Sequence, residues 1–242
     1  MKFSQGDQIW IDLVVELLER YSIELEYGLL THWHGDHTGG VRSLIAHDAT
    51  LATKMYKHMP DPDQQDIAEG QTFEVEGATV RAVHTPGHAI DHMCFVLEQE
   101  NALFSGDNVL GHGYSVVQDL GIYMRSIVKM TALKCLIGYP AHGARIESLP
   151  DKMREYIAHK KVRMKQVMSA LRAKGRSGMT LTEVAKFIYG DIPRETIERA
   201  ILPFLTQVMW KLAEDRAVAF VPGDSATRKW FARPPTKRLH TV

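Results

Sequence analysis

The sequence predicts an α/β domain followed by a smaller, mostly helical region. Up to about residue 150, short strand-like apolar segments alternate with helical ones, and beyond Pro150 the apolar residues recur mostly at helical spacing. Charge divides at the same place: residues 1–150 hold 10 Lys and Arg against 20 Asp and Glu, whereas residues 151–242 hold 19 against 9. This asymmetry indicates regions that have different partners or that pair with each other.

Composition sets the broad class of the protein. The 242 residues, 45% of them apolar, suffice for one large domain or for a medium domain and a small one. No run of about 18 apolar residues could cross a bilayer, and the first ten residues lack the layout of a signal peptide. We therefore expect a soluble cytoplasmic protein. Cys94 and Cys135 each lie in an apolar stretch, which favours free buried thiols over a disulfide or a thiolate metal site.

The elements of the first region follow from hydrophobic spacing. A helix over 8–21 precedes a short strand over 26–30, and a second helix over 40–46 precedes a strand over 50–54. The period then changes to two, which is typical of β-structure. The further elements expected are strands at 73–75, 79–84, 93–97 and 102–105, a helix at 123–134 and a strand at 135–139.

The second region has a different pattern. We expect helices over 151–173, 182–189 and 194–215, then two strands over 217–221 and 229–232 joined by the turn PGDSAT. Three helices and a hairpin resemble a winged-helix unit. The predicted organisation is an α/β domain over 1–150, a basic winged-helix-like domain over 151–233, and a disordered tail over 234–242.

The first candidate functional segment is the string HWHGDH, which directly follows the strand predicted at 26–30. His32, His34, Asp36 and His37 place three imidazoles and a carboxylate within six residues. Zinc prefers such nitrogen and oxygen ligands, and a loop after a strand can turn them toward one point. For any one of these histidines a His-rich surface loop is the simpler explanation, but all four residues together favour a metal site.

Three later segments each add one candidate ligand at the end of a predicted strand. The segment HTPGH supplies His88, SGDN supplies Asp107, and PAHG supplies His142. With these motifs in this order, residues 29–145 resemble the metallo-β-lactamase superfamily. The resemblance implies that residues 1–150 form a catalytic domain with an αββα sandwich fold. We expect this sandwich to lack its amino-terminal strands, because only 31 residues precede His32.

The resemblance also implies the roles of the residues. It places His32, His34 and His88 on one zinc ion and Asp36, His37 and His142 on a second, with Asp107 between them. Paired zinc ions make water acidic enough to supply hydroxide near neutral pH. Asp36, a ligand close to that water, is the expected catalytic proton donor and acceptor. For His84 we favour a structural role, and for His92 either a structural role or one in orienting the ligands.

Superfamily membership alone leaves the substrate open. The segments GDNVLGHGYSVVQDLG and YPAHGA are similar to the discrete thioesterases of fungal non-reducing polyketide synthase clusters. This implies thioester hydrolysis that releases an aromatic polyketide from an acyl carrier protein, with or without Claisen-type ring closure, in secondary metabolism. The alternatives are a single-strand endoribonuclease of the lactamase-like subgroup, whose partner would be nucleic acid, and a glyoxalase II-like thioesterase. No membrane partner is expected.

A basic cluster follows Pro150 on the long predicted helix. Spacings of three, four and seven put several of its members on one face. We expect this face either to remain solvated or to dock an acidic carrier protein, steering its phosphopantetheine arm to the metals. The cluster consists of Lys152, Arg154, Lys160, Lys161, Arg163 and Lys165.

Overall fold

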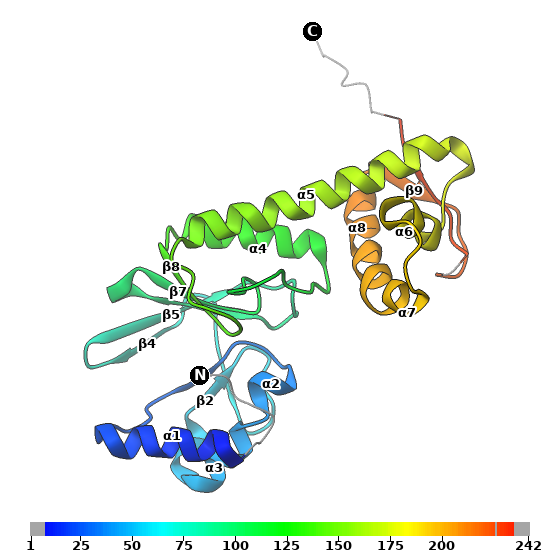
Figure 1. Ribbon diagram of the computed structural model, residues 1–242. Coiled ribbons are helices and arrows are strands. Elements are labelled where there is room, and N and C mark those ends of the chain that lie inside the picture. The colour runs from blue at the N-terminus through cyan, green and yellow to red at the C-terminus, as the bar shows by residue number, and fades with distance from the viewer. Residues whose placement is uncertain (1–7, 226, 235–242) are drawn as a thin grey trace. The chain divides into compact units, whose positions relative to one another are not determined.

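The computed structural model describes residues 8–225 and 227–234 (Figure 1). The chain divides into two compact units, which are described separately here. Unit 1 comprises residues 1–115 and 122–154, and unit 2 comprises residues 116–121 and 155–242. No helix in the described ranges is both long enough and apolar enough to cross a membrane.

Unit 1 contains two β-sheets. The smaller is parallel, in the order β1-β2-β3, and the larger has the order β4-β5-β6-β7-β8. The larger sheet is antiparallel except for its last pair, β7 and β8, which is parallel. The strands are β1 (Gly28–Leu30), β2 (Met55–Lys57), β3 (Gln65–Asp66), β4 (Thr72–Val75), β5 (Ala78–His84), β6 (Met93–Leu97), β7 (Ala102–Gly106) and β8 (Ile137–Pro140).

Helices lie on the outer sides of these sheets. Figure 1 shows α1 and α3 beside the three-stranded sheet and α4 beside the five-stranded sheet, so the layers follow the order α, β, β, α. The expected α/β sandwich is therefore confirmed. The helical segments up to this point are α1 (Gln8–Tyr21), α2 (Gly35–Thr38), α3 (Val41–His47), η1 (Ala49–Thr53), η2 (Glu98–Glu100) and α4 (Leu120–Ala132).

One predicted strand is wrong. Residues 49–53 form the 3₁₀-helix η1, and the strand begins only at Met55. The reason is local: the Asp48 carboxylate accepts hydrogen bonds from the backbone N–H and the hydroxyl of Thr50, at 2.9 and 2.7 Å. An Asp that binds the backbone two residues later turns the chain and competes with an extended conformation.

Two apolar clusters make up the core of unit 1. The first joins α1 and α3 to the three-stranded sheet through residues such as Trp10, Leu44 and Met55. The second contains Phe73 and Phe95 of the five-stranded sheet, with the half-buried Tyr27, Leu29 and Tyr56 packed against it. Tyr27, Tyr56 and Phe73 meet edge to face, with ring centroids 5.0–5.9 Å apart.

The second cluster is open at the edge formed by β1. A cavity of about 400 Å³ lies there, lined on one side by Leu29 and on the other by Val80, Phe95, Phe104 and Tyr139. Phe104 is 39% exposed although it belongs to a central strand. Apolar side chains on this part of the five-stranded sheet thus lack a covering layer among the described residues.

Unit 2 consists of helices and a β-hairpin. Its elements are α5 (Leu149–Lys174), whose first residues belong to unit 1, η3 (Gly175–Ser177), α6 (Leu181–Tyr189), α7 (Arg194–Thr196), the π-helical η4 (Ile197–Ile201), α8 (Leu202–Glu214), β9 (Val218–Phe220) and β10 (Trp230–Ala232). Thr180 and Glu183 form a capping box that starts α6. The expected helices and hairpin are present, with the helix expected over 194–215 divided into three segments. The predicted tail lies, from residue 235 onward, outside the described residues.

The prediction that Lys160 belongs to an exposed basic face of α5 is wrong. Its side chain is buried, with 2% of its surface exposed, and its Nζ lies 4.9 Å from the centre of the Phe204 ring. Burial lowers the pKa of its ammonium group to about 8. Phe204 belongs to α8, and the contact between α8 and Lys160 cannot be predicted from the helical spacing of α5 alone. Lys160 therefore does not belong to a solvent-exposed docking surface.

Candidate metal centre

All seven candidate ligands lie in the segments that follow the carboxyl ends of strands. His32 and His34 follow β1, and the short helix α2 carries Asp36 and His37. The other three follow strands of the larger sheet: His88 comes after β5, Asp107 directly after β7, and His142 after β8. Both sheets therefore contribute to one site.

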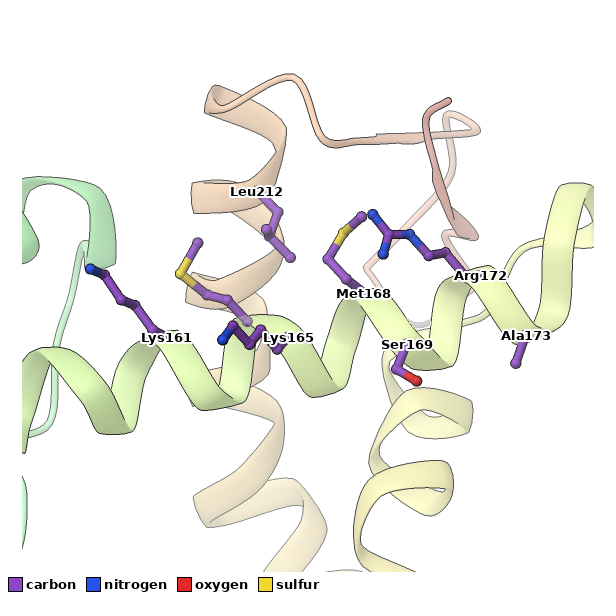
Figure 2. A pocket seen from close by; sticks show the side chains of 8 residues that line it. Lys161, Lys165, Met168, Ser169, Arg172, Ala173 and Leu212 are labelled. Carbon is purple, nitrogen blue, oxygen red and sulfur yellow. The ribbon is translucent and has the colours of Figure 1, made fainter. Parts of the chain in front are cut away.

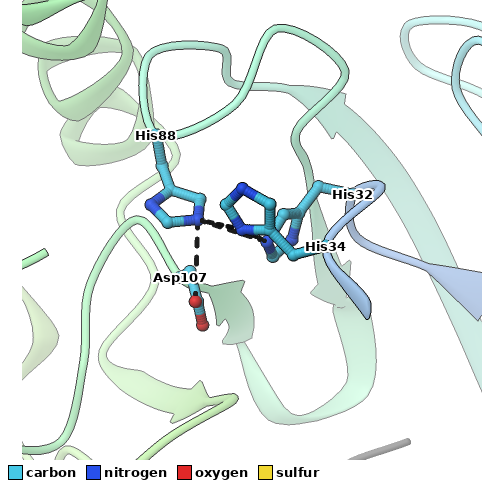
Figure 3. A group of neighbouring side chains, drawn as sticks. All are labelled: His32, His34, His88 and Asp107. Atoms are coloured by element: carbon cyan, nitrogen blue, oxygen red, sulfur yellow. Dashed lines mark hydrogen bonds and ion pairs between the residues drawn. The ribbon is translucent and has the colours of Figure 1, made fainter. Parts of the chain in front are cut away.

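Four of these residues form the first donor group, shown in Figure 3. His32 Nε2 lies 2.8 Å from His34 Nδ1, and His88 Nε2 lies 3.2 and 3.0 Å from these two nitrogens. Oδ2 of Asp107 is 3.6 Å from His88 Nε2. Residues up to 75 positions apart in the chain thus point their donor atoms at a common centre.

The second donor group consists of Asp36, His37 and His142. His142 Nε2 lies 3.4 Å from His37 Nε2 and 3.3 Å from Asp36 Oδ2. Asp107 also reaches this group, because its Oδ2 is 3.5 Å from His37 Nε2 and its Oδ1 is 3.3 Å from His142 Nε2. The Asp107 carboxylate therefore lies between the two groups, as a bridging ligand would.

The donor set fits zinc. Bonds of about 2.0–2.1 Å in tetrahedral geometry separate neighbouring donor atoms by about 3.3 Å, and the distances within both groups, 2.8–3.6 Å, bracket that value. Oδ1 of Asp107 is also buried and accepts no hydrogen bond from the described residues. A buried carboxylate oxygen of this kind is expected to have a partner, and a metal ion would provide one.

Protonation of the site also suits metal binding. Burial, reinforced by the neighbouring imidazoles, lowers the pKa of His32 far below its usual range. Burial raises the pKa of Asp107, but the hydrogen bond from His37 and the surrounding imidazoles outweigh this effect and lower it to about 2. His32 is therefore favoured as neutral imidazole and Asp107 as carboxylate, the forms in which these groups bind metal ions.

Hydroxyl groups orient two of the rings. Thr31 Oγ1 lies 3.0 Å from His32 Nδ1, and Ser115 Oγ lies 3.3 Å from His88 Nδ1. When Nε2 of each ring presents its lone pair to the centre, Nδ1–H donates to the hydroxyl oxygen. Such partners fix the tautomer and orientation of ligating histidines.

His92 lies directly behind Asp107. The ring is fully buried, and its Nε2 accepts a hydrogen bond from the Asp107 backbone N–H at 3.1 Å. Its proton must then reside on Nδ1, which lies 3.2 Å from Thr85 Oγ1. Gly106, which directly precedes Asp107, has φ +52°, and a Cβ on Gly106 would lie 2.5 Å from His92 Nε2. His92 thus supports the backbone that presents Asp107, whereas His84 contacts the Ile90 carbonyl at 3.0 Å and belongs to neither donor group.

A buried ion pair supports the loop that carries His88, and the motifs alone did not suggest it. Lys57 on β2 and Asp91 are each 3% exposed at the side chain, and their charged atoms are 3.1 Å apart. The Lys57 ammonium also donates to the carbonyls of His58 and Met59. The ion pair joins the smaller sheet to the loop of the larger one. An isolated lysine in a three-residue strand gives no sequence signal for such a partner.

Comparison with known proteins identifies relatives over nearly the whole chain. Residues 23–142 match the model of the metallo-β-lactamase superfamily. The chain is 57% identical to the lactamase-like protein aptB of Emericella nidulans, over 95% of this chain and 76% of that protein. It is also 57% identical to the lactamase-like protein vrtG of Penicillium aethiopicum, over 94% of this chain and 76% of the relative.

Solved structures show the same fold. A β-lactamase domain protein from Burkholderia ambifaria aligns with a TM-score of 0.76 and 15% identity, covering 96% of this chain and 82% of that one. At this identity the likeness concerns the fold alone, but the sequence relatives establish the family. The chain therefore belongs to the metallo-β-lactamase superfamily, which indicates a metal-dependent hydrolase.

Proposed function

We propose that this protein is a two-zinc thioesterase that releases an aromatic polyketide from an acyl carrier protein. The observation that carries the proposal is the pair of donor groups sharing Asp107, in a chain that is 57% identical to fungal lactamase-like proteins. The substrate class rests on the likeness of residues 106–121 and 139–144 to discrete fungal polyketide thioesterases. The names of the relatives state no substrate.

The proposal divides the ligands between two ions. His32, His34 and His88 would hold the first ion and Asp36, His37 and His142 the second. Asp107 would contact both, because its carboxylate oxygens also lie near His37 and His142. Bound zinc supplies Lewis acidity, which polarises the substrate carbonyl and makes water a stronger acid. Every ligand has a close donor neighbour within its group.

Asp36 is suited to proton transfer. Its side chain is 33% exposed, whereas the Asp107 side chain is 13% exposed. Asp36 therefore remains accessible to water and substrate while its Oδ2 faces His142. In thioester hydrolysis it would take the proton from the attacking water and return it to the departing thiolate, which yields a carboxylic acid and a thiol. In the Claisen-type variant, a substrate carbon loses the proton, attacks the same carbonyl and expels the same thiol.

The main rival is cleavage of single-stranded RNA, because residues 151–242 carry 19 Lys and Arg against 9 Asp and Glu. A basic surface also suits an acidic carrier protein, so charge alone does not separate the two functions. The glyoxalase II-like alternative requires the same metal site with glutathione thioesters as substrates.

The decisive experiment measures metal content and substrate choice together on the full chain. We expect about two zinc ions per chain in protein purified without chelator, and hydrolysis of an acyl carrier thioester in preference to lactoylglutathione and single-stranded RNA. Metal content near zero would contradict the metal assignment. Preferred cleavage of RNA would establish the nuclease instead.

Replacement of Asp36 tests its proposed role. Asp36→Ala should lower kcat by at least about 100-fold and leave the melting temperature of the metal-loaded protein nearly unchanged. Asp63→Ala, which removes an exposed carboxylate distant in sequence from every ligand, is the matched control and should retain full activity. Normal turnover of Asp36→Ala with both metals bound would exclude Asp36 from proton transfer.

A further inference from the structure

Unit 2 contains a groove of about 740 Å³ between α5 and α8 (Figure 2). Most of its lining comes from one side of α5, and Leu212 of α8 closes it. The lining residues are Lys161, Met164, Lys165, Met168, Ser169, Arg172, Ala173 and Leu212.

The groove has a basic stripe along one side of the helix. Lys161, Lys165 and Arg172 recur at intervals of four and seven residues, which at 3.6 residues per turn places them within about 40° of one another. All three side chains are exposed. Three positive charges therefore face solvent along about three turns of helix.

These three cations differ from many others in unit 2. Arg194, Arg199 and Lys211 each form an ion pair with a carboxylate four residues away. By contrast, Lys161, Lys165 and Arg172 form no ion pair with any residue in the ranges 8–225 and 227–234. No ion pair with the described residues thus compensates the basic stripe.

The floor of the groove is apolar and deformable. Met164 and Met168 are partly buried one turn apart, and Leu212 is 4% exposed. Methionine is flexible and polarisable, which suits surfaces that must fit the apolar face of a partner helix. The lining contains no aromatic ring on which a nucleobase could stack, so it lacks the feature typical of single-strand nucleic-acid grooves.

We propose that this groove docks an acidic amphipathic helix of the acyl carrier protein, an inference that rests on the proposed function for the identity of the partner. The apolar face of the helix lies on Met164, Met168 and Leu212. Its acidic flank faces Lys161, Lys165 and Arg172. Charge steers the encounter, and the methionine floor adds contact area that depends little on salt.

The test measures binding of a phosphopantetheinylated carrier domain from a fungal non-reducing polyketide synthase to the full chain by calorimetry. Combined replacement of Lys161, Lys165 and Arg172 by Glu should weaken Kd at least about tenfold and greatly reduce its salt dependence. Met168→Gln preserves charge and should weaken Kd about threefold through the floor alone. Melting temperatures of the variants establish that they are folded.

Lys174→Glu is the matched control. Lys174 is exposed on the same helix, but helical spacing places it on the opposite side from Lys165, so it should change Kd less than about twofold. If Lys174→Glu weakened carrier binding as much as the groove variant, or if Met168→Gln had no effect on Kd, diffuse charge attraction would explain the binding. Either result would overturn the proposal. Absence of carrier binding by the unaltered protein would overturn it as well.

Two further measurements separate this proposal from the proposed function. Carrier binding that requires the groove, in a protein that hydrolyses no thioester, would support docking and refute the enzymatic proposal. Hydrolysis of carrier thioesters with binding insensitive to all groove variants would support the enzyme and refute the docking site. Loss of RNA binding, with carrier binding unchanged in the same variants, would assign the groove to nucleic acid.

Discussion

Gly106→Ala should damage the protein through one identifiable contact. Gly106 has φ +52°, and an added Cβ would lie 2.5 Å from His92 Nε2 and 2.9 Å from its Cε1. The left-handed conformation costs alanine roughly 1–2 kcal/mol. The His92 ring cannot move away freely, since it is fully buried and bonded to the Asp107 N–H. Overpacking of this kind adds about 1–3 kcal/mol, so the free energy of unfolding should fall by about 2–5 kcal/mol.

Gly77→Ala isolates the packing contribution. Gly77 has φ +78° in the turn between β4 and β5, and a Cβ there meets no atom within 4 Å. This control should lose only the backbone contribution, roughly 1–2 kcal/mol. The assay is denaturant unfolding of both variants together with titration of zinc. Gly106→Ala should also weaken zinc binding about 10- to 100-fold, because His92 supports the Asp107 backbone.

A double-mutant cycle decides whether the contact with His92 is responsible. In a His92→Ala background the ring is absent, so Gly106→Ala should cost about 1–3 kcal/mol less than in the unaltered protein. Equal cost in both backgrounds would refute the overlap. Equal destabilisation by Gly77→Ala and Gly106→Ala would lead to the same conclusion.

Two further predictions concern buried charges. Lys57→Met should lower the free energy of unfolding by about 3–5 kcal/mol, because it leaves the buried Asp91 carboxylate without its ion-pair partner. Combining Lys57→Met with Asp91→Leu should recover most of that free energy, as measured by thermal unfolding. Equal destabilisation of the two variants would contradict this reasoning. Burial lowers the pKa of Lys160 from 10.5 to about 8, so the unfolded chain binds more protons between these values and the Lys160 contribution to stability rises with pH there. Lys160→Met should therefore raise the free energy of unfolding at pH 7 by at most about 3 kcal/mol, and this gain in stability should shrink above pH 8. A gain in stability that stays constant up to pH 10.5 would refute this reasoning.

The candidate ligands could be predicted because each belongs to a local motif at the end of a strand. In each case the strand brings the chain to the edge of its sheet where the site lies, and the segment that follows orients the ligand side chain. The strand pattern and the ligand motif therefore lie within a few residues of each other in the sequence. The structure brings His32, His88 and Asp107 into one donor group and places His142 in the second. The distances between their donor atoms depend on the fold, whereas the ligand residues themselves can be identified from the local motifs.

The supporting contacts could not be predicted in the same way. Lys57 and Asp91 are 34 residues apart, and neither has a motif that names its partner. Helical spacing placed Lys160 beside Lys161 in one basic cluster. Successive residues on a helix differ by about 100° in direction, so one can be buried against α8 while its neighbour faces solvent. Which side is covered depends on tertiary packing, and local spacing carries no information about it.

The metal centre and the open edge of unit 1 are connected. His32, His34, Asp36 and His37 follow the smaller sheet, and the remaining ligands follow the larger one. Bound ions would therefore link the two sheets, as the Lys57–Asp91 pair also does. The cavity beside β1 is lined by Leu29 and Phe104 and extends to His37 and Gly106. Because the apolar contact between the sheets is incomplete on that side, a metal ion bound by His37 and Asp107 would contribute more to holding the sheets together than it would in a sandwich closed on both sides.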